Sequence, residues 1–379
     1  MITFASKSNC CGCEACSQIC PKSCIQLHED EEGFIYPYVK TELCVNCGLC
    51  ERICPINTAR EQNLPKETYC AINTNRKVVR ESSSGGVFLA IAEQVINKGG
   101  IVFGASFNEH WEVSHKWASE TASLDGFKGS KYVQSRISNA YREVYDFLRQ
   151  GKYVLFSGTP CQISALKSFL KIDYDNLLTV EVACHGVPSP KIYRNYLNFV
   201  SQNRIDSITS VSFRDKKKSW LQYRVVIKAI KNGKNIEIVD DLRSDNIYLQ
   251  SFLNNYNLRP SCYNCSFKSG RSHADITLAD FWGVWNVLPT LDHSNGASAV
   301  LINTIKGKTV FGKLDIQKQP VNYSDVVPYN SCLVKSSSEP SDRKLFWEYW
   351  ARGNRKLLKQ LLFPSKKSIV KRIIDRFFK

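Results

Sequence analysis

The sequence predicts an α+β protein with three parts: a small cysteine-rich N-terminal domain, a mixed α/β core and a basic helical C-terminal tail. The first observation is that ten of the 16 cysteines lie within the first 54 of 379 residues. The second is that strand-like and helix-like patterns alternate over residues 69–205, which favours a layered α/β core. The third is that residues 343–379 carry twelve Lys/Arg and two Asp/Glu, or +10 of the net charge of +16.

Composition excludes several classes of protein. With 43% hydrophobic and 23% charged residues, the chain is not mostly disordered. Its apolar runs stay short of the roughly 18 residues that a membrane-spanning helix needs. No apolar stretch precedes the first cysteines, so we expect no secretory signal and a cytoplasmic location. Cysteines in a reducing compartment favour metal ligation over disulfides.

Two identical cysteine motifs, C-x2-C-x2-C-x3-C-P, dominate the N-terminal domain of residues 1–57. Each member of the second motif lies 34 positions after its counterpart, so the motifs form an internal repeat. The members are Cys10, Cys13, Cys16, Cys20 and Pro21, and then Cys44, Cys47, Cys50, Cys54 and Pro55.

This spacing is typical of two [4Fe-4S] clusters that exchange their fourth ligands. Three thiolates of one tight loop reach one cluster, and the fourth cysteine reaches the other. We therefore expect Cys54 to complete the first motif's cluster and Cys20 to complete the second. The alternative is a pair of zinc sites, although zinc more often takes two CxxC pairs. Cys11 and Cys24 fall outside the motifs and are predicted to be packing thiols.

The N-terminal domain resembles a bacterial-type two-cluster ferredoxin. Residues 27–39 are predicted to form a hairpin that turns near Gly33, which matches the ferredoxin layout. Its charge is nearly balanced, with five Lys/Arg against seven Asp/Glu over residues 1–60. Two close clusters suit a one-electron relay, so a terminus is expected elsewhere in the chain or in a partner.

The first part of the core is predicted to be a largely parallel sheet covered by helices. A polar linker, residues 58–68, precedes it, and the part extends over residues 69–205. The expected strands are 100–107, 152–156 and 177–184, and the expected helices are 87–97, 136–149 and 162–170.

The second part, residues 206–330, is predicted to be an α+β half that could be fused to the first. The Asn-Gly pair within residues 231–234 favours a tight hairpin turn. The expected strands are 208–213, 221–230, 235–239, 276–281 and 299–303, and the expected helix is 245–256.

Three short segments of the core could carry chemistry. Residues 82–86 (SSSGG) precede a helix and could bind an anion with free amides, or simply cap that helix. Residues 156–162 (FSGTPCQ) form a turn at the end of a strand, where ligands of open sheets bind, although Cys161 could be a buried inert thiol. Cys184 and His185 follow another strand, and His185 could contact a cofactor, act as an acid or base, or serve only as a structural hydrogen bonder.

Four core cysteines could hold a third [4Fe-4S] cluster. Cys262 and Cys265 form one CxxC pair, which alone is ambiguous among zinc, disulfide and iron–sulfur chemistry. Cys161 and Cys184 add the two ligands that a cluster would still need. Cys70 and Cys332 carry no motif.

Several of these segments, with others, occur in an order that is similar to the coenzyme F420 hydrogenase/dehydrogenase beta-subunit family. They are SSGGVF, GSKYVQS (residues 129–135), SGTPCQ, CHGVPSP (184–190), and SCYNC with LADFWG (278–283). The resemblance covers about residues 68–330. It implies an iron–sulfur flavoprotein that binds FAD beside a [4Fe-4S] cluster and passes electrons to a two-electron carrier. Some members reduce the deazaflavin F420, and bacterial members with a ferredoxin head are often associated with cell-surface polysaccharide synthesis.

The resemblance also indicates which residues contact the flavin, and His185 joins them from its place at the end of a strand. The candidates are Ser83, Ser84, Gly85, Gly86, Lys131, Tyr132, Gly158, Thr159, Pro160 and His185. No catalytic side chain is predicted, because a flavin would carry the chemistry itself.

The tail, residues 331–379, departs from the family. Apolar residues recur at helical spacing within 368–379, with basic residues on the other face. Such a helix could lie on anionic lipid at the cytoplasmic face of a membrane, contact an acidic partner, or pack on its own domain. Nucleic acid is not an expected partner, since no binding motif accompanies the charge.

These observations together predict a flavin- and iron–sulfur-dependent oxidoreductase whose partner is a redox protein or a small electron carrier. One alternative is an electron-transfer subunit that feeds a partner enzyme and has no substrate of its own. Another is a non-redox scaffold whose cysteines hold zinc.

Overall fold

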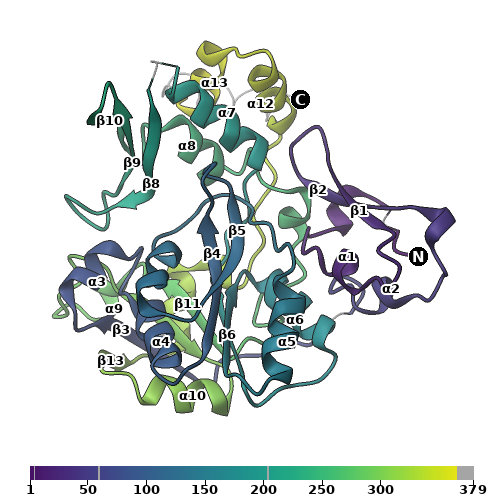
Figure 1. Cartoon of the computed structure of the whole chain (residues 1–379). Helices are drawn as coiled ribbons and strands as arrows, with labels where there is room; N and C mark the ends of the chain where they lie inside the picture. Colours follow the sequence, from purple (N-terminus) through teal and green to yellow (C-terminus); the bar gives the residue numbers. More distant parts are fainter. Residues whose placement is uncertain (4, 59, 203–204, 365–379) are drawn as a thin grey trace, which may run out of the picture.

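An eight-stranded mixed sheet forms the centre of the protein (Figure 1). The structure is a computed structural model, and it describes residues 1–3, 5–58, 60–202 and 205–364. The strand order is β13-β3-β12-β11-β7-β6-β4-β5. These strands are β3 (Glu67–Asn73), β4 (Ile101–Phe107), β5 (Val113–Ala118), β6 (Val154–Gly158), β7 (Leu177–Val182), β11 (Ile276–Asp280), β12 (Ser298–Ile302) and β13 (Ile316–Pro320).

The sheet is parallel only in its middle, from β11 through β7 and β6 to β4. The remaining pairings, at both sides, are antiparallel. The expectation of a largely parallel sheet is therefore wrong at the edges, where the sequence pattern does not predict β3, β5 and β13. β13 has the sequence IQKQP and is mostly exposed, so its strand pattern is weak. Because strands from both sides of residue 206 share this sheet, the two predicted halves have one common core.

Helices lie on both faces of the sheet and around the N-terminal domain (Figure 1). The 3-10 helices of the core include η3 (Thr121–Phe127) and η4 (Pro260–Asn264). The α-helices of the core are α3 (Arg76–Glu81), α4 (Val87–Ile96), α5 (Ala140–Arg149), α6 (Pro160–Leu170), α7 (Pro190–Val200), α8 (Ile247–Leu253), α9 (Val284–Val287), α10 (Ile305–Gly312) and α11 (Tyr323–Val326). Among the described residues, no helix is long and apolar enough to cross a bilayer.

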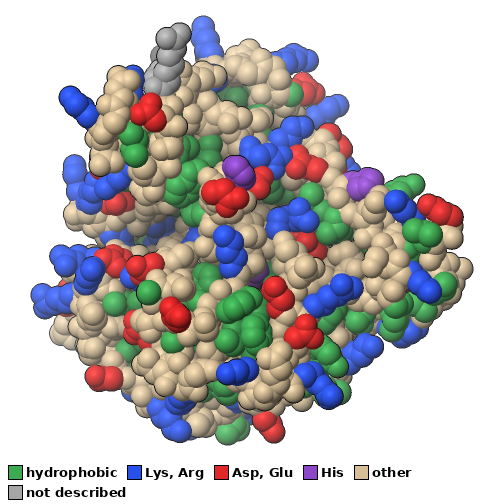
Figure 2. Space-filling model, in the orientation of Figure 1, with side chains coloured by type: hydrophobic (Ala, Val, Ile, Leu, Met, Phe, Trp, Pro, Cys, Tyr) green, Lys and Arg blue, Asp and Glu red, His purple; other side chains and the backbone are tan. Residues whose placement is uncertain are grey.

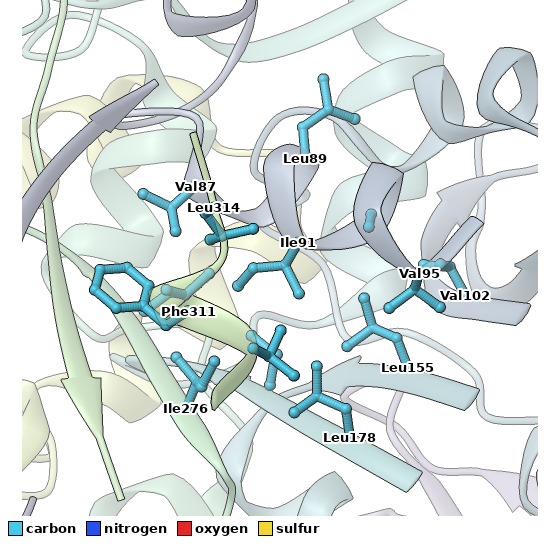
Figure 3. Packing of buried hydrophobic residues seen from close by; sticks show 14 of the residues in the cluster. Val87, Leu89, Ile91, Val95, Val102, Leu155, Leu178, Ile276, Phe311 and Leu314 are labelled. Carbon is cyan, nitrogen blue, oxygen red and sulfur yellow. The ribbon is translucent and has the colours of Figure 1, made fainter. Parts of the chain in front are cut away.

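The largest apolar cluster lies between α4 and the sheet (Figure 3). Ile91 projects from α4 and is fully buried, against side chains that include Leu155 of β6 and Leu178 of β7. Phe311 of α10 closes the cluster from the side of β12. Burial of one such side chain stabilises the fold by roughly 1.5–3 kcal/mol.

A second, three-stranded antiparallel sheet stands beside the core, in the order β10-β9-β8. Its strands are β8 (Ser207–Asp215), β9 (Arg224–Lys231) and β10 (Lys234–Leu242). Asn232 and Gly233 both have positive φ, at 49° and 71°, as the predicted Asn-Gly hairpin requires.

The described part of the tail packs against helices α7 and α8, which lie next to the three-stranded sheet. Helices α12 (Arg343–Ala351) and α13 (Arg355–Leu362) contribute Phe346, Leu358 and Leu361 to the cluster that includes α7 and α8. As far as Leu362, the tail therefore packs on the core, while the alternatives for the amphipathic helix concern residues 368–379. The amphipathic pattern at 368–379 lies outside the described residues.

The described residues of the N-terminal domain include two strands and two short α-helices, with the predicted hairpin turning at Gly33. The strands β1 (Ile25–Glu29) and β2 (Ile35–Val39) are antiparallel, and Gly33 has a φ of 86°. The helices are α1 (Ala15–Ile19) and α2 (Leu49–Arg52). Figure 1 shows this domain against the side of the core that carries α5 and α6.

The packing under α4 gives a first prediction. Replacement of Ile91 by Ala should lower the free energy of unfolding by about 2–5 kcal/mol, because a fully buried side chain leaves a cavity. Denaturant titration followed by circular dichroism measures this change. Ile305→Ala is the matched control, because Ile305 is 67% exposed. Equal losses in the two variants would contradict the packing described here.

Candidate functional site

The first cysteine set of the N-terminal domain surrounds a cavity of about 220 Å³. Cys10, Cys13 and Cys16 come from the first motif, and Cys54 comes from the end of the second. Apolar side chains, among them Leu27, complete the wall. The structure thus brings together the four residues that the exchange of fourth ligands predicts.

The second set surrounds a smaller cavity of about 20 Å³, again with its fourth member exchanged. The cavity is lined by Cys44, Cys47 and Cys50 together with Cys20. The Cys20 sulfur lies 3.3 Å from the sulfur of Cys24, which also lines this cavity. Cys24 is therefore a neighbour of the second set and not simply a remote packing thiol.

The internal repeat extends to the backbone conformation of the two loops. Gly12 and Glu14 have positive φ, at 69° and 59°, and so do Asn46 and Gly48, at 53° and 69°. Each of the latter two lies 34 positions after its counterpart. Left-handed residues between successive cysteines turn the chain tightly, so that three thiols can face one cavity.

Both sets surround a space and do not converge on a point. Within the parts of the chain that the structure describes, no three His, Cys, Asp or Glu side chains are close enough to hold one metal ion. A single zinc ion needs its sulfurs at about 2.3 Å, whereas a four-iron cluster needs its ligands spread around a larger body. The cavity of the first set, about 220 Å³, suits the larger body, whereas that of the second set is smaller, at about 20 Å³.

The four core cysteines come together at the carboxyl ends of β6 and β7. Cys161 lies in the first turn of α6, Cys184 follows β7, and Cys262 and Cys265 belong to or follow η4. Burial raises the pKa of the Cys184 thiol, and the neighbouring thiols of the other three raise it further. Burial likewise raises the pKa of Cys262 to about 12. The sequence-based grouping of these four residues is thus reproduced in space, and the thiols stay protonated unless a metal displaces the protons.

A buried lysine that the sequence did not single out lies against this group. The Lys268 ammonium donates hydrogen bonds to the carbonyl oxygens of Cys184, at 2.5 Å, and Cys332, at 2.8 Å. Its charge opposes the upward shift in the pKa of Cys184. Sequence carries little signal for this position, because a lysine is normally an exposed residue.

Cys11 connects the N-terminal domain to the core. It is buried, as a packing thiol would be, but its thiol also lies close enough to those of Cys13 and Cys161 that both influence its pKa, which is raised. Cys13 belongs to the first cysteine set of the N-terminal domain (the first head set), and Cys161 belongs to the four core cysteines (the core set). The two sets are therefore neighbours across the domain contact.

The domain contact itself is anchored by a buried carboxylate, Glu14. Its oxygens accept hydrogen bonds from Arg136 Nε, at 2.7 Å, and from the backbone amides of Ile137, at 3.1 Å, and Ser138, at 3.2 Å. The Glu14 side chain is only 3% exposed, while Arg136 is 43% exposed. A second ion pair joins Arg343 of α12 to Glu32 of the β1–β2 turn.

A pocket of about 350 Å³ opens between β8 and the loops that flank α3 and η3. It brings together two predicted flavin segments, since Ser83 and Lys131 both line it. The Ser130 hydroxyl donates a hydrogen bond to that of Ser83, at 2.7 Å. Figure 2 shows the molecule hollowed on this side, below the lobe that contains the three-stranded sheet.

Two cations reach this pocket from buried positions. Burial lowers the pKa of Lys131 to about 8, and its ammonium donates to the carbonyl oxygen of Lys128 at 2.9 Å. Arg214 of β8 pairs with Asp280 of β11 through Nη1, while its Nε and Nη2 have no hydrogen-bond partner among the described residues. Sequence analysis missed Arg214, since a lone arginine in a strand carries no motif.

The remaining residues of the SSGG segment serve the fold. Ser84 donates a hydrogen bond to the carbonyl oxygen of Ala297, at 2.6 Å, and the Gly85 amide donates to the Ser298 hydroxyl, at 3.0 Å. These bonds attach the start of α4 to β12, so the Gly85 amide is not free for a ligand. Gly86 precedes the helix with a φ of 77°. Residues 84–86 of the segment therefore cap the start of α4, which is the structural alternative to an anion site.

The other flavin candidates lie away from the pocket, beside the core cysteines. Thr159 and Gln162 form a capping box at the start of α6, and the Thr159 hydroxyl is 3.1 Å from the Cys161 sulfur. Gly158 ends β6 and Pro160 begins α6. His185 stands edge-on to Phe252, and burial lowers its pKa. These residues do not join Ser83 and Lys131 along the pocket.

Tyr132 is buried next to the pocket without lining it. Its ring stacks on Phe252 at 4.8 Å, and its carbonyl oxygen accepts a hydrogen bond from Tyr248 at 2.6 Å. Burial raises the pKa of its hydroxyl to about 12.

Comparison with known proteins identifies the two parts of the chain. Residues 9–58 match the 4Fe-4S dicluster domain, and residues 151–324 match the family described as the C terminus of the coenzyme F420 hydrogenase/dehydrogenase beta subunit. Residues 151–324 are therefore similar to the C-terminal part of this family. The recognition of an iron–sulfur head fused to such a core is confirmed. The match starts at residue 151, so Ser83 and Lys131 precede the matched part of this beta-subunit domain.

Individual relatives are distant. The chain is 26% identical over 169 residues to the F subunit of the F(420)H(2) dehydrogenase from Methanosarcina mazei, a match that covers 42% of this chain and 47% of the relative. It therefore spans about half the length of that relative. A chain of the F420-reducing [NiFe] hydrogenase complex from Methanosarcina barkeri, solved with xenon, is 16% identical with a TM-score of 0.46, covering 79% of this chain and 93% of the other.

Proposed function

We propose that this protein is an iron–sulfur flavoprotein oxidoreductase. Electrons pass between two head clusters, a core cluster and a flavin, which exchanges hydride equivalents with a carrier or substrate. The observation that carries the proposal is the contact of Cys11 with both Cys13 and Cys161, because it makes the head and core cysteine sets neighbours. The clusters supply one-electron steps, and the flavin supplies the conversion to a two-electron step.

The cysteine sets are suited to hold clusters. The proposed ligands are Cys10, Cys13, Cys16 and Cys54 for the first head cluster, Cys20, Cys44, Cys47 and Cys50 for the second, and Cys161, Cys184, Cys262 and Cys265 for the core cluster. Burial raises the pKa values of the four core thiols, so nearby charges act on them with little screening, whereas Cys47 of the second head set is exposed. Lys268 then provides a positive charge beside the core set.

The pocket beside β8 is the proposed flavin site. Its volume of about 350 Å³ lies within the range of small-ligand sites. Arg214 offers two N–H groups without partners among the described residues, and Lys131 adds a second cation. Phe107 and Trp111, which also line the pocket, offer aromatic surfaces against which a ring could stack. The cations suit the phosphates or the reduced, electron-rich ring of a flavin nucleotide.

The electron donor and acceptor are proposed to be a redox partner protein or a small carrier. The relative from Methanosarcina mazei is named as one subunit of a dehydrogenase, which supports a protein partner. Its name also supports coenzyme F420 as the small carrier. The link to polysaccharide synthesis and a membrane contact through the tail stay predictions.

The alternative is an electron-transfer subunit with clusters and no substrate of its own. It differs from the main proposal in what the isolated protein can do. A purified flavoprotein of the first kind oxidises or reduces a hydride carrier by itself, while a relay subunit exchanges electrons only with its partner enzyme.

The first test is the cofactor content of the full-length protein, purified without oxygen. About twelve iron atoms per chain, with matching sulfide, and one flavin are expected from three four-iron clusters. Plasma emission spectroscopy and flavin extraction measure these amounts. About eight iron atoms and no flavin would favour the relay subunit, and zinc in place of iron would contradict the redox function altogether.

Replacement of Cys161 by Ala tests the core cluster. The variant should lose about four iron atoms per chain and keep the head clusters, because only the core set loses a ligand. Cys70→Ala is the matched control, since Cys70 is a buried thiol outside the core set whose pKa is raised to about 12 by burial alone. A Cys161→Ala protein that retains all its iron would show that the core set holds no cluster.

The pH dependence of flavin binding tests the role of Lys131. An anionic ligand favours the protonated lysine, so flavin should bind more tightly below the lysine's pKa of about 8 and more weakly above it. We expect an affinity loss of up to about tenfold between pH 7 and pH 9 from this one group.

Two variants separate Lys131 from its neighbours. Lys131→Met should abolish the pH-dependent loss, as measured by fluorescence titration of flavin at each pH. Lys128→Met should retain it, because Lys128 lines the same pocket but its pKa is raised by Asp125 and Glu81, against the effect of burial. The same pH profile in wild type and Lys131→Met would exclude Lys131 from the site.

A further inference from the structure

We propose that Arg259 raises the reduction potential of the first head cluster. An electron in the relay would then reside preferentially on this cluster, which is the head cluster next to the core. This inference rests on the proposed function, because it assumes that Cys10 ligates a cluster. Arg259 directly precedes η4, which carries the core cysteine Cys262, and it is completely buried. It thus spans the contact between the two domains.

The guanidinium is directed at Cys10. Nε donates a hydrogen bond to the Cys10 carbonyl oxygen at 2.7 Å, and Nη2 donates to the Cys10 sulfur at 3.5 Å. Nη2 also donates to the carbonyl oxygen of Ile35 at 3.0 Å, and Nη1 donates to Gln134 at 3.1 Å. The group lies over the ring of Tyr36, 4.2 Å from its centre.

These acceptors are carbonyl or amide oxygens and one sulfur, and none is a carboxylate. An arginine stays charged at any physiological pH, and a buried cation is costly without a negative partner. The thiolate of Cys10, together with the anionic cluster that it would bind, supplies that negative charge. Arg259 therefore has its counter-charge at the cluster and not in a side-chain carboxylate.

The consequence for electron transfer follows from the charges. Reduction adds one electron to the cluster, and a fixed cation with an N–H···S bond stabilises the reduced form more than the oxidised form. Burial strengthens this effect because little water screens it. The first head cluster should then hold the electron more tightly than it would without Arg259.

The repeat provides an internal comparison, since among the described residues the second motif has no equivalent of Arg259 at its sulfurs. Gly12 leaves the space that the guanidinium fills, because a Cβ there would lie 2.6 Å from Arg259 Nη1. Asn46 stands 34 positions later and contacts the Cys44 sulfur through its Oδ1, at 3.7 Å. The arginine near the second motif, Arg52, is exposed and donates to the Cys47 carbonyl oxygen, at 2.9 Å.

The test is a redox titration of the full-length protein, followed by electron paramagnetic resonance of the reduced clusters. Arg259→Gln should make one head cluster harder to reduce, with a tenfold lower ratio of reduced to oxidised cluster at a fixed potential. For a one-electron couple this is a shift of about 59 mV to more negative potential. Arg259→Lys keeps the positive charge but loses the planar guanidinium, so the shift in reduction potential should be smaller than in Arg259→Gln.

Arg52→Gln is the matched control, and it should leave the potential of that same cluster unchanged. Iron content and thermal unfolding are measured on each variant. If Arg259→Gln loses its iron or its fold, Arg259→Met decides, because it also removes the charge: a fully loaded Arg259→Met protein with a wild-type potential overturns the proposal. An unmoved potential in a loaded Arg259→Gln protein, or an equal shift in Arg52→Gln, overturns it as well. Absence of iron from the wild-type protein would instead refute the proposed function.

Discussion

The docking of the cysteine-rich head on the core is the constraint on which the rest of the proposed relay depends. Glu14 anchors this docking through its buried carboxylate, which accepts hydrogen bonds from Arg136 and from two backbone amides. A buried charge is tolerated only with such full satisfaction, so the contact has one geometry. That geometry places the Cys11 thiol between Cys13 and Cys161. Without it, the head cysteines would have no fixed relation to the core set.

The core sheet provides the other half of the arrangement. Its parallel middle directs the ends of β6 and β7 to the same edge, which brings Cys161 and Cys184 together. The cysteines and the pocket then occupy different places, since the pocket lies at β8 and holds Lys131 and Arg214. This separation suits a protein in which clusters deliver electrons and a second site performs hydride chemistry.

Several site residues were predictable because their chemistry depends on local spacing. The eight head cysteines are fixed by two short motifs, and the exchange of Cys20 and Cys54 follows from the motif itself. The four core cysteines are predicted only by counting ligands, and the structure brings them close together. The flavin candidates were less predictable: Ser83 and Lys131 line the pocket, but Gly85 uses its amide for the fold.

The sequence by itself determined the local features: the repeat, the Asn-Gly turn, the main strands and helices, and the family. Each depends on residues close together in the chain, where spacing and backbone preference decide. Only the tertiary structure decided the antiparallel edges of the sheet, the place of Cys11 and the contacts of Arg214 and Arg259. These residues act through contacts across long separations, such as that of Arg259 with Cys10, and no local pattern specifies which distant groups a buried cation will meet.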